Sequence, residues 1–416
     1  MHGYNQYLTY VLLTLVFISS WVDINGIYAE LPQIILTQPE RWKLGAYLAL
    51  ITNLGNFAPL TLVLIKCFCR KCQINPIPIN YTVILIGMIS CFLLIFFWSH
   101  TSIVANQPRS TALFILAFFL SLLDCTSSVS FADYVHRFRK EFTSTLFLGE
   151  SLTAILPSLL AIAQGDGQLT CIPSTNNGTN TSEAVYQTAR FSVSIYFLCL
   201  FILLTISFIS LILLQCTSIA RQARSEISSI IDTDNDNEPK QPLTQFSYLL
   251  LSFICVYTNS IIFGLLLSIA TYVLMPYGHR IFYLGTILSP WMLTFVWIIG
   301  IIKPLIGKRY VLAFVLLGSI TFGLELFVSF QSPCPPWVGT TKGSILILII
   351  WLCTYIFLGY PRLVIANYVR IHSSNGMFWY GVQVQIGALI GSIIAYLLVE
   401  TFGLFRERIP CEELIC

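Results

Sequence analysis

Charged residues are scarce in this sequence. Only 10% of its 416 residues are Asp, Glu, Lys or Arg, against roughly a quarter in an average soluble domain. Apolar residues make up 56% of the chain. So little charge excludes an ordinary soluble enzyme or a nucleic-acid-binding domain, and it indicates a polytopic membrane protein whose main partner is the lipid bilayer.

Catalytic and nucleotide-binding signatures are also absent. The sequence has no Walker loop and no H-E-x-x-H motif. Its five histidines fall in expected loops or tails without metal-ligand spacing: His2, His100, His136, His279 and His372. We therefore expect no enzyme activity, no cofactor, no metal and no ATP hydrolysis by this chain.

Long apolar runs fill most of the chain. A helix needs about 20 apolar residues to cross roughly 30 Å of hydrocarbon. Windows of that length predict eleven spans near residues 7–36, 44–65, 80–97, 110–134, 143–163, 191–219, 244–272, 280–301, 310–330, 343–367 and 374–402. The prediction is an all-α polytopic membrane protein with eleven transmembrane helices. We interpret the first as a retained helix, because no Lys or Arg precedes it as in a signal peptide.

A polar segment divides these spans into six and five. The stretch "DTDNDNEPKQP" is charged, contains proline and lacks apolar periodicity, which predicts a disordered linker. We therefore expect a six-helix bundle at 1–220, a cytoplasmic linker at 221–243 and a five-helix bundle at 244–416. Two bundles joined in this way are typical of carriers that rock one half against the other around a central site.

Basic residues and sequons predict the orientation. With the N-terminus cytoplasmic and the C-terminus extracellular, more of the 22 Lys and Arg residues fall on inner loops than on the outer side. The loop between spans five and six then lies outside. Its "NNGTNTS" stretch carries N-glycosylation sequons at Asn177 and Asn180, which are modified only on that side.

Four cysteines also fall outside, where disulfides persist: Cys171, Cys334, Cys411 and Cys416. A bond between Cys334 and Cys411 would tie the loop after span nine to the C-terminus. Four cysteines allow three pairings, and a free or otherwise paired thiol is the alternative.

Polar side chains interrupt the first span at "SSWVDINGIYAELP". Trp21 and Asn25 are four residues apart and share a helix face, whereas Asp23 points elsewhere and needs a partner on another helix. An indole and a carboxamide on one face suit a flat, uncharged ligand rich in heteroatoms. Aromatic-belt and helix-packing roles are the alternative. We expect Glu30 to lie near the outer interface, where its charge is tolerated.

Span four, "LLDCTSSVSFADY", holds a polar stripe that ends in an aromatic ring: Asp124, Ser127, Ser128 and Phe131. Span five carries Glu150. Asp124 and Glu150 are the candidates for proton coupling, because a carboxyl group in the membrane can take up a proton outside and release it inside. A neutral structural acid is the alternative for each.

The second half has two notable motifs. "GYPRLV" places Tyr360 next to a proline, so we expect the helix to kink or open there. "GVQVQIGALIG" places Gln385 among Gly381, Gly387 and Gly391; the glycines predict close helix packing, and Gln385 is expected to face a cavity. Glu400, near the end of the last span, is interpreted as an ordinary interfacial residue.

Together the motifs resemble those of the animal riboflavin transporter family, the vitamin B2 solute carriers. The resemblance rests on "SSWVDINGIYAELP" with "PERW" after it, "YLALITNLGNFAPL", "LLDCTSSVSF", "FLGESLTAILPSLLAIAQG" and "VQIGALIG". It implies a plasma-membrane uptake carrier for riboflavin that works by alternating access without ATP. It also implies an MFS-like 6+5 fold and, in some members, uptake favoured by acidic pH.

The chemistry of riboflavin agrees with the polar residues. The ligand is planar, is uncharged near neutral pH, and has an amide-like edge and a hydroxylated tail. Trp21 is expected to stack on the ring, and Asn25 and Gln385 to bind the edge. The full predicted substrate set is Trp21, Asn25, Ser127, Ser128, Phe131, Tyr360 and Gln385. A carrier for nucleosides or other planar heterocycles, and a cell-surface receptor, are the alternative functions.

Overall fold

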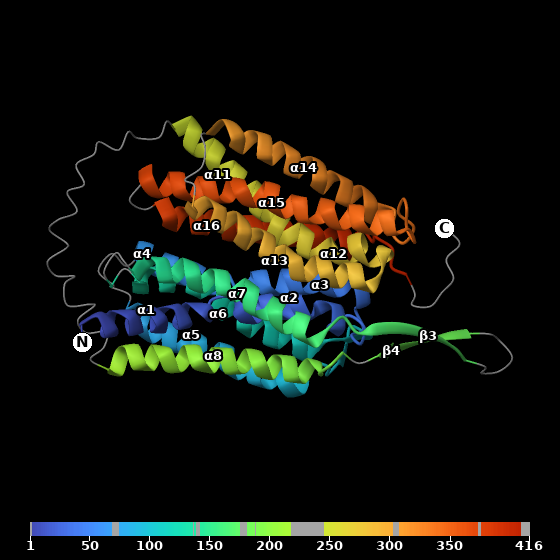
Figure 1. Ribbon diagram of the computed structural model, residues 1–416, viewed down its shortest axis with the longest axis horizontal. Coiled ribbons are helices and arrows are strands. Elements are labelled where there is room, and N and C mark those ends of the chain that lie inside the picture. Colours follow the sequence, from blue (N-terminus) through green and yellow to red (C-terminus); the bar gives the residue numbers. More distant parts are fainter. Residues whose placement is uncertain are drawn as a thin grey trace.

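The computed structural model describes residues 2–68, 75–135, 137–138, 142–174, 181–187, 189–217, 245–302, 308–372 and 376–408. Over these residues the chain is nearly all helical, as predicted, apart from two short antiparallel hairpins. The helices run roughly along one axis and form two bundles, one from each half of the sequence (Figure 1).

In the described part of the first half there are eight α-helices. They are α1 (His2–Ile18), α2 (Val22–Ile34), α3 (Leu44–Leu54), α4 (Phe57–Phe68), α5 (Pro76–Phe97), α6 (Thr111–Val135), α7 (Thr143–Gln164) and α8 (Val193–Cys216), with a 3₁₀ turn, η1 (Arg41–Lys43), before α3. One hairpin joins β1 (Ser102–Val104) to β2 (Gln107–Arg109), with Ser102 opposite Arg109. The other joins β3 (Gln168–Ser174) to β4 (Thr181–Gln187), with Gln168 opposite Gln187.

The second half combines long α-helices with short π- and 3₁₀-helical segments. They are α11 (Gln245–Asn259), the π-helix η3 (Ser260–Leu266), α12 (Leu267–Leu274), the 3₁₀ turn η4 (Met275–Tyr277), α13 (His279–Ile302), α14 (Lys308–Phe330), α15 (Thr341–His372), α16 (Gly376–Tyr396) and the π-helix η5 (Leu397–Thr401). α15 remains one helix across Pro361, so the predicted opening of the helix at this proline is not observed.

Nine helical segments of the described chain are long and apolar enough to cross a membrane. α1 and α2 together form another candidate span, which is bent by 52°, and α7 contributes a shorter apolar segment at Leu148–Gln164. In chain order these segments match the predicted spans. The count of eleven and the orientation of the termini stay predictions.

The two ends of the bundle differ. Figure 1 places β3 and β4 at one end, and the start of α1, the end of α8 and the start of α11 at the other. We call these the hairpin end and the linker end. The halves meet where α2, α3 and α7 pack against α12, α13 and α16.

Glycines allow α16 to pack directly against η3. A Cβ on Gly391 would lie 2.0 Å from the carbonyl oxygen of Ser260, and one on Gly387 would lie 2.5 Å from that of Val256. The predicted packing role is confirmed for these two glycines. It is wrong for Gly381, where a Cβ would meet nothing within 4 Å.

Candidate transport site

A break in the first span lies between α1 and α2. Ser19 Oγ and Ser20 Oγ donate to the carbonyl oxygens of Val16 (2.7 Å) and Phe17 (2.8 Å). Such side-chain bonds to preceding carbonyls compete with regular helix. Trp21 then leaves the helical conformation, with φ −143° and ψ 6°, before α2 begins. Broken helices in carriers commonly surround the substrate, because their free backbone groups can face a polar cavity.

Trp21 and Asn25 lie at this break, and both are half-buried. The Asn25 amide nitrogen donates to the carbonyl oxygen and the hydroxyl of Thr153 on α7, at 3.3 Å each. These contacts fix the carboxamide between α2 and α7 and leave its oxygen as an acceptor for a ligand.

The polar stripe of α6 is mostly enclosed. Ser127 Oγ donates to the carbonyl oxygens of Asp124 (2.8 Å) and Ser20 (3.2 Å) and is buried. Phe131 is also buried, with its ring 5.5 Å from that of Phe17. Ser128 is half-buried and is therefore the most open of the predicted contacts on this helix.

The two predicted contacts in the second half have different surroundings. Tyr360 is buried against Phe314, with ring centroids 4.3 Å apart, in a small apolar cluster with Val296 and Leu363. Gln385 is half-buried on α16. Gln385 is therefore the more accessible of the two.

Asp23 has a partner that the sequence did not identify. Its carboxyl group interacts with that of Asp124 on α6, and both residues are fully buried. Asp23 thus leaves the Trp21 face of α2 and joins α2 to α6. The sequence showed only that each of these two acids lies in an apolar span, and nothing in it linked one to the other.

Glu30 lies toward the hairpin end, but its charge is not exposed to solvent as expected near an interface. Glu30 is fully buried, and its Oε1 accepts a hydrogen bond from Gln164 Nε2 at 2.8 Å. Gln164 ends α7 and also donates to the carbonyl oxygen of Phe191. The amide of Gln164, on a neighbouring helix, therefore supplies the hydrogen bond that water was expected to supply to Glu30.

Glu150 and Arg362 bring opposite charges together from the two halves. Glu150, half-buried on α7, interacts electrostatically with Arg362 on α15, which is buried. The Arg362 guanidinium lies 4.5 Å from the Phe263 ring centroid. An opposite charge nearby on the other half makes each of the two charges less costly in an apolar environment.

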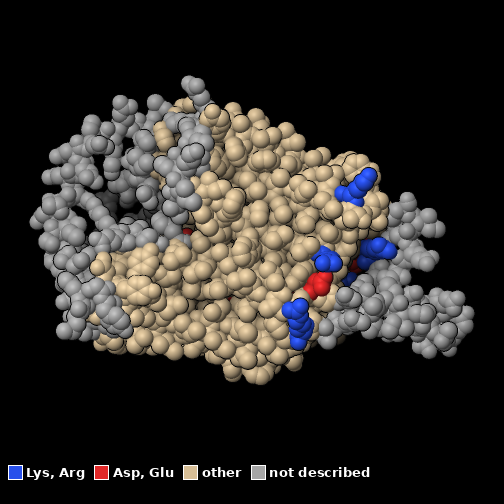
Figure 2. Space-filling view, viewed as in Figure 1, with Lys and Arg blue, Asp and Glu red and all other residues tan. Residues whose placement is uncertain are grey.

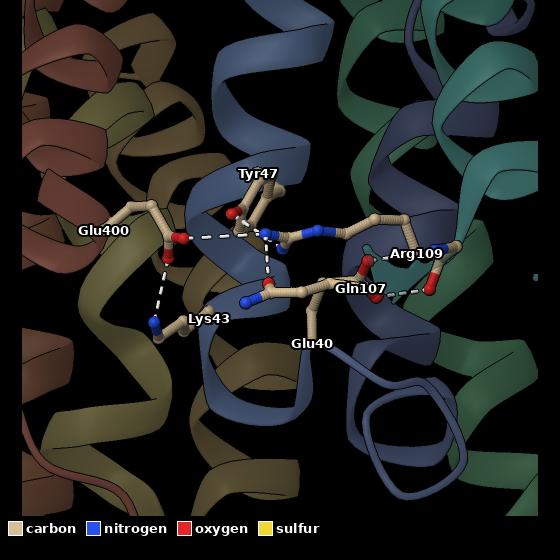
Figure 3. Close-up of polar contacts among 7 residues, drawn as sticks. Glu40, Lys43, Tyr47, Gln107, Arg109 and Glu400 are labelled. Atoms are coloured by element: carbon tan, nitrogen blue, oxygen red, sulfur yellow. Dashed lines mark hydrogen bonds and ion pairs between the residues drawn. The ribbon is translucent and has the colours of Figure 1, made fainter. Parts of the chain in front are cut away.

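An ion-pair network joins the halves at the hairpin end (Figure 3). Glu400 of η5 accepts from Lys43 Nζ at 2.9 Å and lies 3.6 Å from Arg109 NH2. Arg109 also donates to the Tyr47 hydroxyl at 2.7 Å, and Tyr47 is hydrogen-bonded to Glu400. One carboxylate of the second half is thus held by three side chains of the first. We name Lys43, Tyr47, Arg109 and Glu400 the outer cluster.

The first-half side of the outer cluster is itself braced. Arg109 NH2 donates to Gln107 Oε1 at 2.9 Å, which ties the β2 strand to the cluster. The Ser110 backbone N–H donates to Glu40 Oε1 at 2.9 Å, and its hydroxyl also donates to Glu40. Figure 3 shows these groups presenting Arg109 toward Glu400.

Further hydrogen bonds between the halves lie at the same end. Thr271 donates to the carbonyl oxygen of Trp42 (2.7 Å), and Tyr283 donates to that of Ala161 (2.8 Å). A His279 ring nitrogen lies 2.9 Å from the carbonyl oxygen of Pro32. Together with the outer cluster, these bonds hold the two halves against each other at the hairpin end.

Charge on the surface follows the same division. Most charged side chains that are visible in Figure 2 gather at the hairpin end, and the long sides of the bundle are largely uncharged. Exposed apolar residues on those sides include Phe92, Ile202 and Ile320. An apolar belt of this kind suits a lipid environment.

The remaining predicted sites are only partly described. Cys334 is disulfide-bonded, but Cys411 lies outside the described residues. Asn177 and Asn180 also lie outside them. Within the described chain, no group of three His, Cys, Asp or Glu residues is arranged to hold a metal ion.

Comparison with solved structures identifies the fold. The structure is similar to the nucleoside transporter NupG, with a TM-score of 0.56 and 11% identity, covering 95% of this chain and 92% of that one. It is also similar to a bacterial homologue of the human lysosomal transporter Spinster, with a TM-score of 0.53 and 12% identity, covering 96% and 83% of the two chains. Both are MFS-like transporters, so the fold is MFS-like.

Comparison of the sequence identifies the family. The model of solute carrier family 52, riboflavin transporter, matches residues 5–245 and 222–407. Riboflavin transporter member 3-A of Danio rerio is 33% identical, covering 95% of this chain and 96% of the relative. Member 2 of Homo sapiens is 29% identical, covering 98% and 97%. The chain belongs to solute carrier family 52, the riboflavin transporter family.

Proposed function

We propose that this protein carries riboflavin across the plasma membrane into the cell by alternating access, without ATP. Relatives that match nearly the whole chain are named riboflavin transporters, and their substrate is the first candidate here. The proposed orientation puts the linker end in the cytoplasm and the hairpin end outside.

The single observation that carries the mechanism is the set of bonds that joins the halves at the hairpin end. The outer cluster and three further hydrogen bonds join them at the hairpin end. A carrier that is closed outside must open inside to release its substrate, and then reverse. Breaking the outer cluster is the corresponding step on the way to an outward-open form.

The proposed substrate site surrounds the break between α1 and α2. Trp21 stacks on the isoalloxazine ring, and the free Asn25 oxygen accepts from the ring N–H. Gln385 contributes an amide from the second half, and Ser128 a hydroxyl for the ribityl tail. Ser127, Phe131 and Tyr360 come into contact with the substrate only if the buried groups around them move.

Proton coupling is the second part of the proposal. Uptake is favoured by acidic pH because a carboxyl group takes up a proton outside and releases it inside. Asp124 and Glu150 are the two candidates. Glu150 has the positive charge of Arg362 nearby, whereas Asp124 faces another carboxyl group. Because two adjacent carboxylates repel each other, we place the coupled proton at Asp124 first.

The test is competition of labelled riboflavin uptake in cells that express the protein. An excess of unlabelled riboflavin should abolish accumulation of the label, and an equal excess of nucleosides should leave it unchanged. Cells that lack the protein give the background. Equal competition by nucleosides would replace riboflavin by a wider class of planar heterocycles.

A further inference from the structure

We propose that Asp23 and Asp124 together form one proton-binding site, in which Asp124 holds the proton and donates it to a charged Asp23. The inference deepens the proposed function and rests on it, because it names the site and the state of the coupled proton. It concerns a pair of acids, one on each side of the interface between α2 and α6.

The pairing itself requires a proton. The two carboxyl groups interact with each other, and neither Asp23 Oδ2 nor either carboxyl oxygen of Asp124 accepts a hydrogen bond from any other described residue. A carboxylate has no hydrogen to donate, so two charged groups could not satisfy each other. One member must therefore carry a proton, since two like charges in contact within an apolar interior cannot both persist. Both residues are fully buried, so water does not screen the repulsion that a doubly charged pair would have.

The surroundings decide which acid carries the charge. Asp23 is the second residue of α2, and its Oδ1 accepts the backbone N–H of Ile24 at 3.0 Å. A helix N-terminus favours negative charge. Neither carboxyl oxygen of Asp124 has a donor among the other described residues. The charge is consequently more stable on Asp23 and the proton on Asp124.

The groups around the pair supply no cation. Cys91 of α5 and Cys125 of α6 are the titratable side chains that interact with it, and both are buried. Within the described chain, no Lys, Arg or His forms an ion pair with either acid. The negative charge on Asp23 therefore has no positive partner. A second proton would neutralise this charge, so the pair binds a proton from outside favourably.

The pair is connected to the break that carries the proposed substrate contacts. Asp23 follows Trp21 by two residues and precedes Asn25 by two. On α6, Ser127 donates both to the carbonyl oxygen of Asp124 and to that of Ser20, inside the break. A second proton removes the charge at the N-terminus of α2, and this change reaches the break directly. Proton binding is thereby linked to the geometry of Trp21 and Asn25.

The experiment compares labelled riboflavin uptake at acidic and neutral external pH for wild type, Asp23→Asn and Asp124→Asn. Both substitutions keep the size of the side chain and remove its titration. We expect wild-type uptake to rise at acidic pH, and each variant to lose that rise while it remains at the cell surface. Glu325→Gln is the matched control, because Glu325 is another fully buried acid, held by Thr354 at 2.7 Å, and it should keep the wild-type pH profile.

A second measurement tests the proton site even if the Asp variants do not transport riboflavin. In purified wild-type protein, infrared spectroscopy should show a protonated carboxylic acid whose C=O band disappears in Asp124→Asn and persists in Glu325→Gln. A wild-type pH profile in both Asp variants, or no loss of that band, would overturn the proton site. An absence of wild-type riboflavin uptake at both pH values would instead overturn the proposed function.

Discussion

Lys43 Nζ and Glu400 Oε2 lie 2.9 Å apart and form an ion pair between residues separated by 357 positions in the chain. Lys43 ends the turn before α3, and Glu400 belongs to the π-helix that follows α16. The same carboxylate lies 3.6 Å from Arg109. This contact joins the two halves directly, so it must break whenever the hairpin end opens.

Glu400→Gln should shift the carrier toward the form that is open at the hairpin end. The pair is partly exposed, so its loss is worth about 0.5–1 kcal/mol, a roughly 2- to 5-fold change in the ratio of the two forms. A thiol introduced by Thr271→Cys, buried at this end, reports the opening. Its alkylation by a membrane-impermeant maleimide should be faster in the Glu400→Gln background by that factor.

The matched control is Glu407→Gln. Glu407 lies 3.9 Å from Arg41, and the Arg41 side chain is 53% exposed, so this pair is weak. Alkylation should stay at the wild-type rate. Equally faster alkylation in Glu400→Gln and Glu407→Gln would contradict a specific role of Glu400 in holding the hairpin end closed.

Trp21→Ala should weaken substrate recognition without unfolding the protein. Stacking contributes about 0.5–1.5 kcal/mol beyond burial, which corresponds to a roughly 2- to 10-fold rise in the apparent KM for riboflavin. Trp337→Ala is the control, because Trp337 is 65% exposed in a loop and should keep the wild-type KM. An unchanged KM in Trp21→Ala would assign the indole to helix packing.

Gly391→Ala should destabilise the second half. The added methyl group would meet the backbone of Ser260 at 2.0 Å, and overpacking of this kind costs about 1–3 kcal/mol. Gly381→Ala adds the same group to the same helix in open space. Thermal unfolding in detergent should show a lower Tm only for the first variant, and an equal Tm would contradict the close packing of α16 on η3.

Glu150→Gln should reduce riboflavin uptake at acidic and neutral pH by the same factor, roughly 5-fold for a loss of about 1 kcal/mol. The reason is that the change removes a compensating charge near Arg362, whereas we propose the proton site at Asp124. Arg362→Lys keeps the charge and should retain more uptake than Glu150→Gln. A flattened pH profile in Glu150→Gln would move proton coupling from Asp124 to Glu150.

The sequence was sufficient to locate the helical segments along the chain. Apolar runs have a length that the bilayer dictates, so these segments follow from local information. The close packing at Gly387 and Gly391 was also predictable, because glycines spaced four residues apart in a membrane helix usually mark where another helix lies close.

Contacts between distant segments could not be predicted in the same way. The sequence showed Asp23 as a costly acid without a partner, and only the packing of α2 on α6 brings it to Asp124. Glu400 had the pattern of an ordinary interfacial residue, because nothing in the chain links it to Lys43. Glu30 was expected near the outer interface, where its charge would be tolerated, yet it is buried and accepts a hydrogen bond from Gln164 inside the bundle.

The most direct test of alternating access is a cross-link across the hairpin end. In the Lys43→Cys, Glu400→Cys double variant, a short cross-linker that reacts with two thiols and contains a disulfide should stop labelled riboflavin uptake. A reductant that cleaves the cross-linker should restore it. Each single variant, treated identically, should continue to transport. Undiminished uptake by the fully cross-linked double variant would contradict transport through opening and closing of this end.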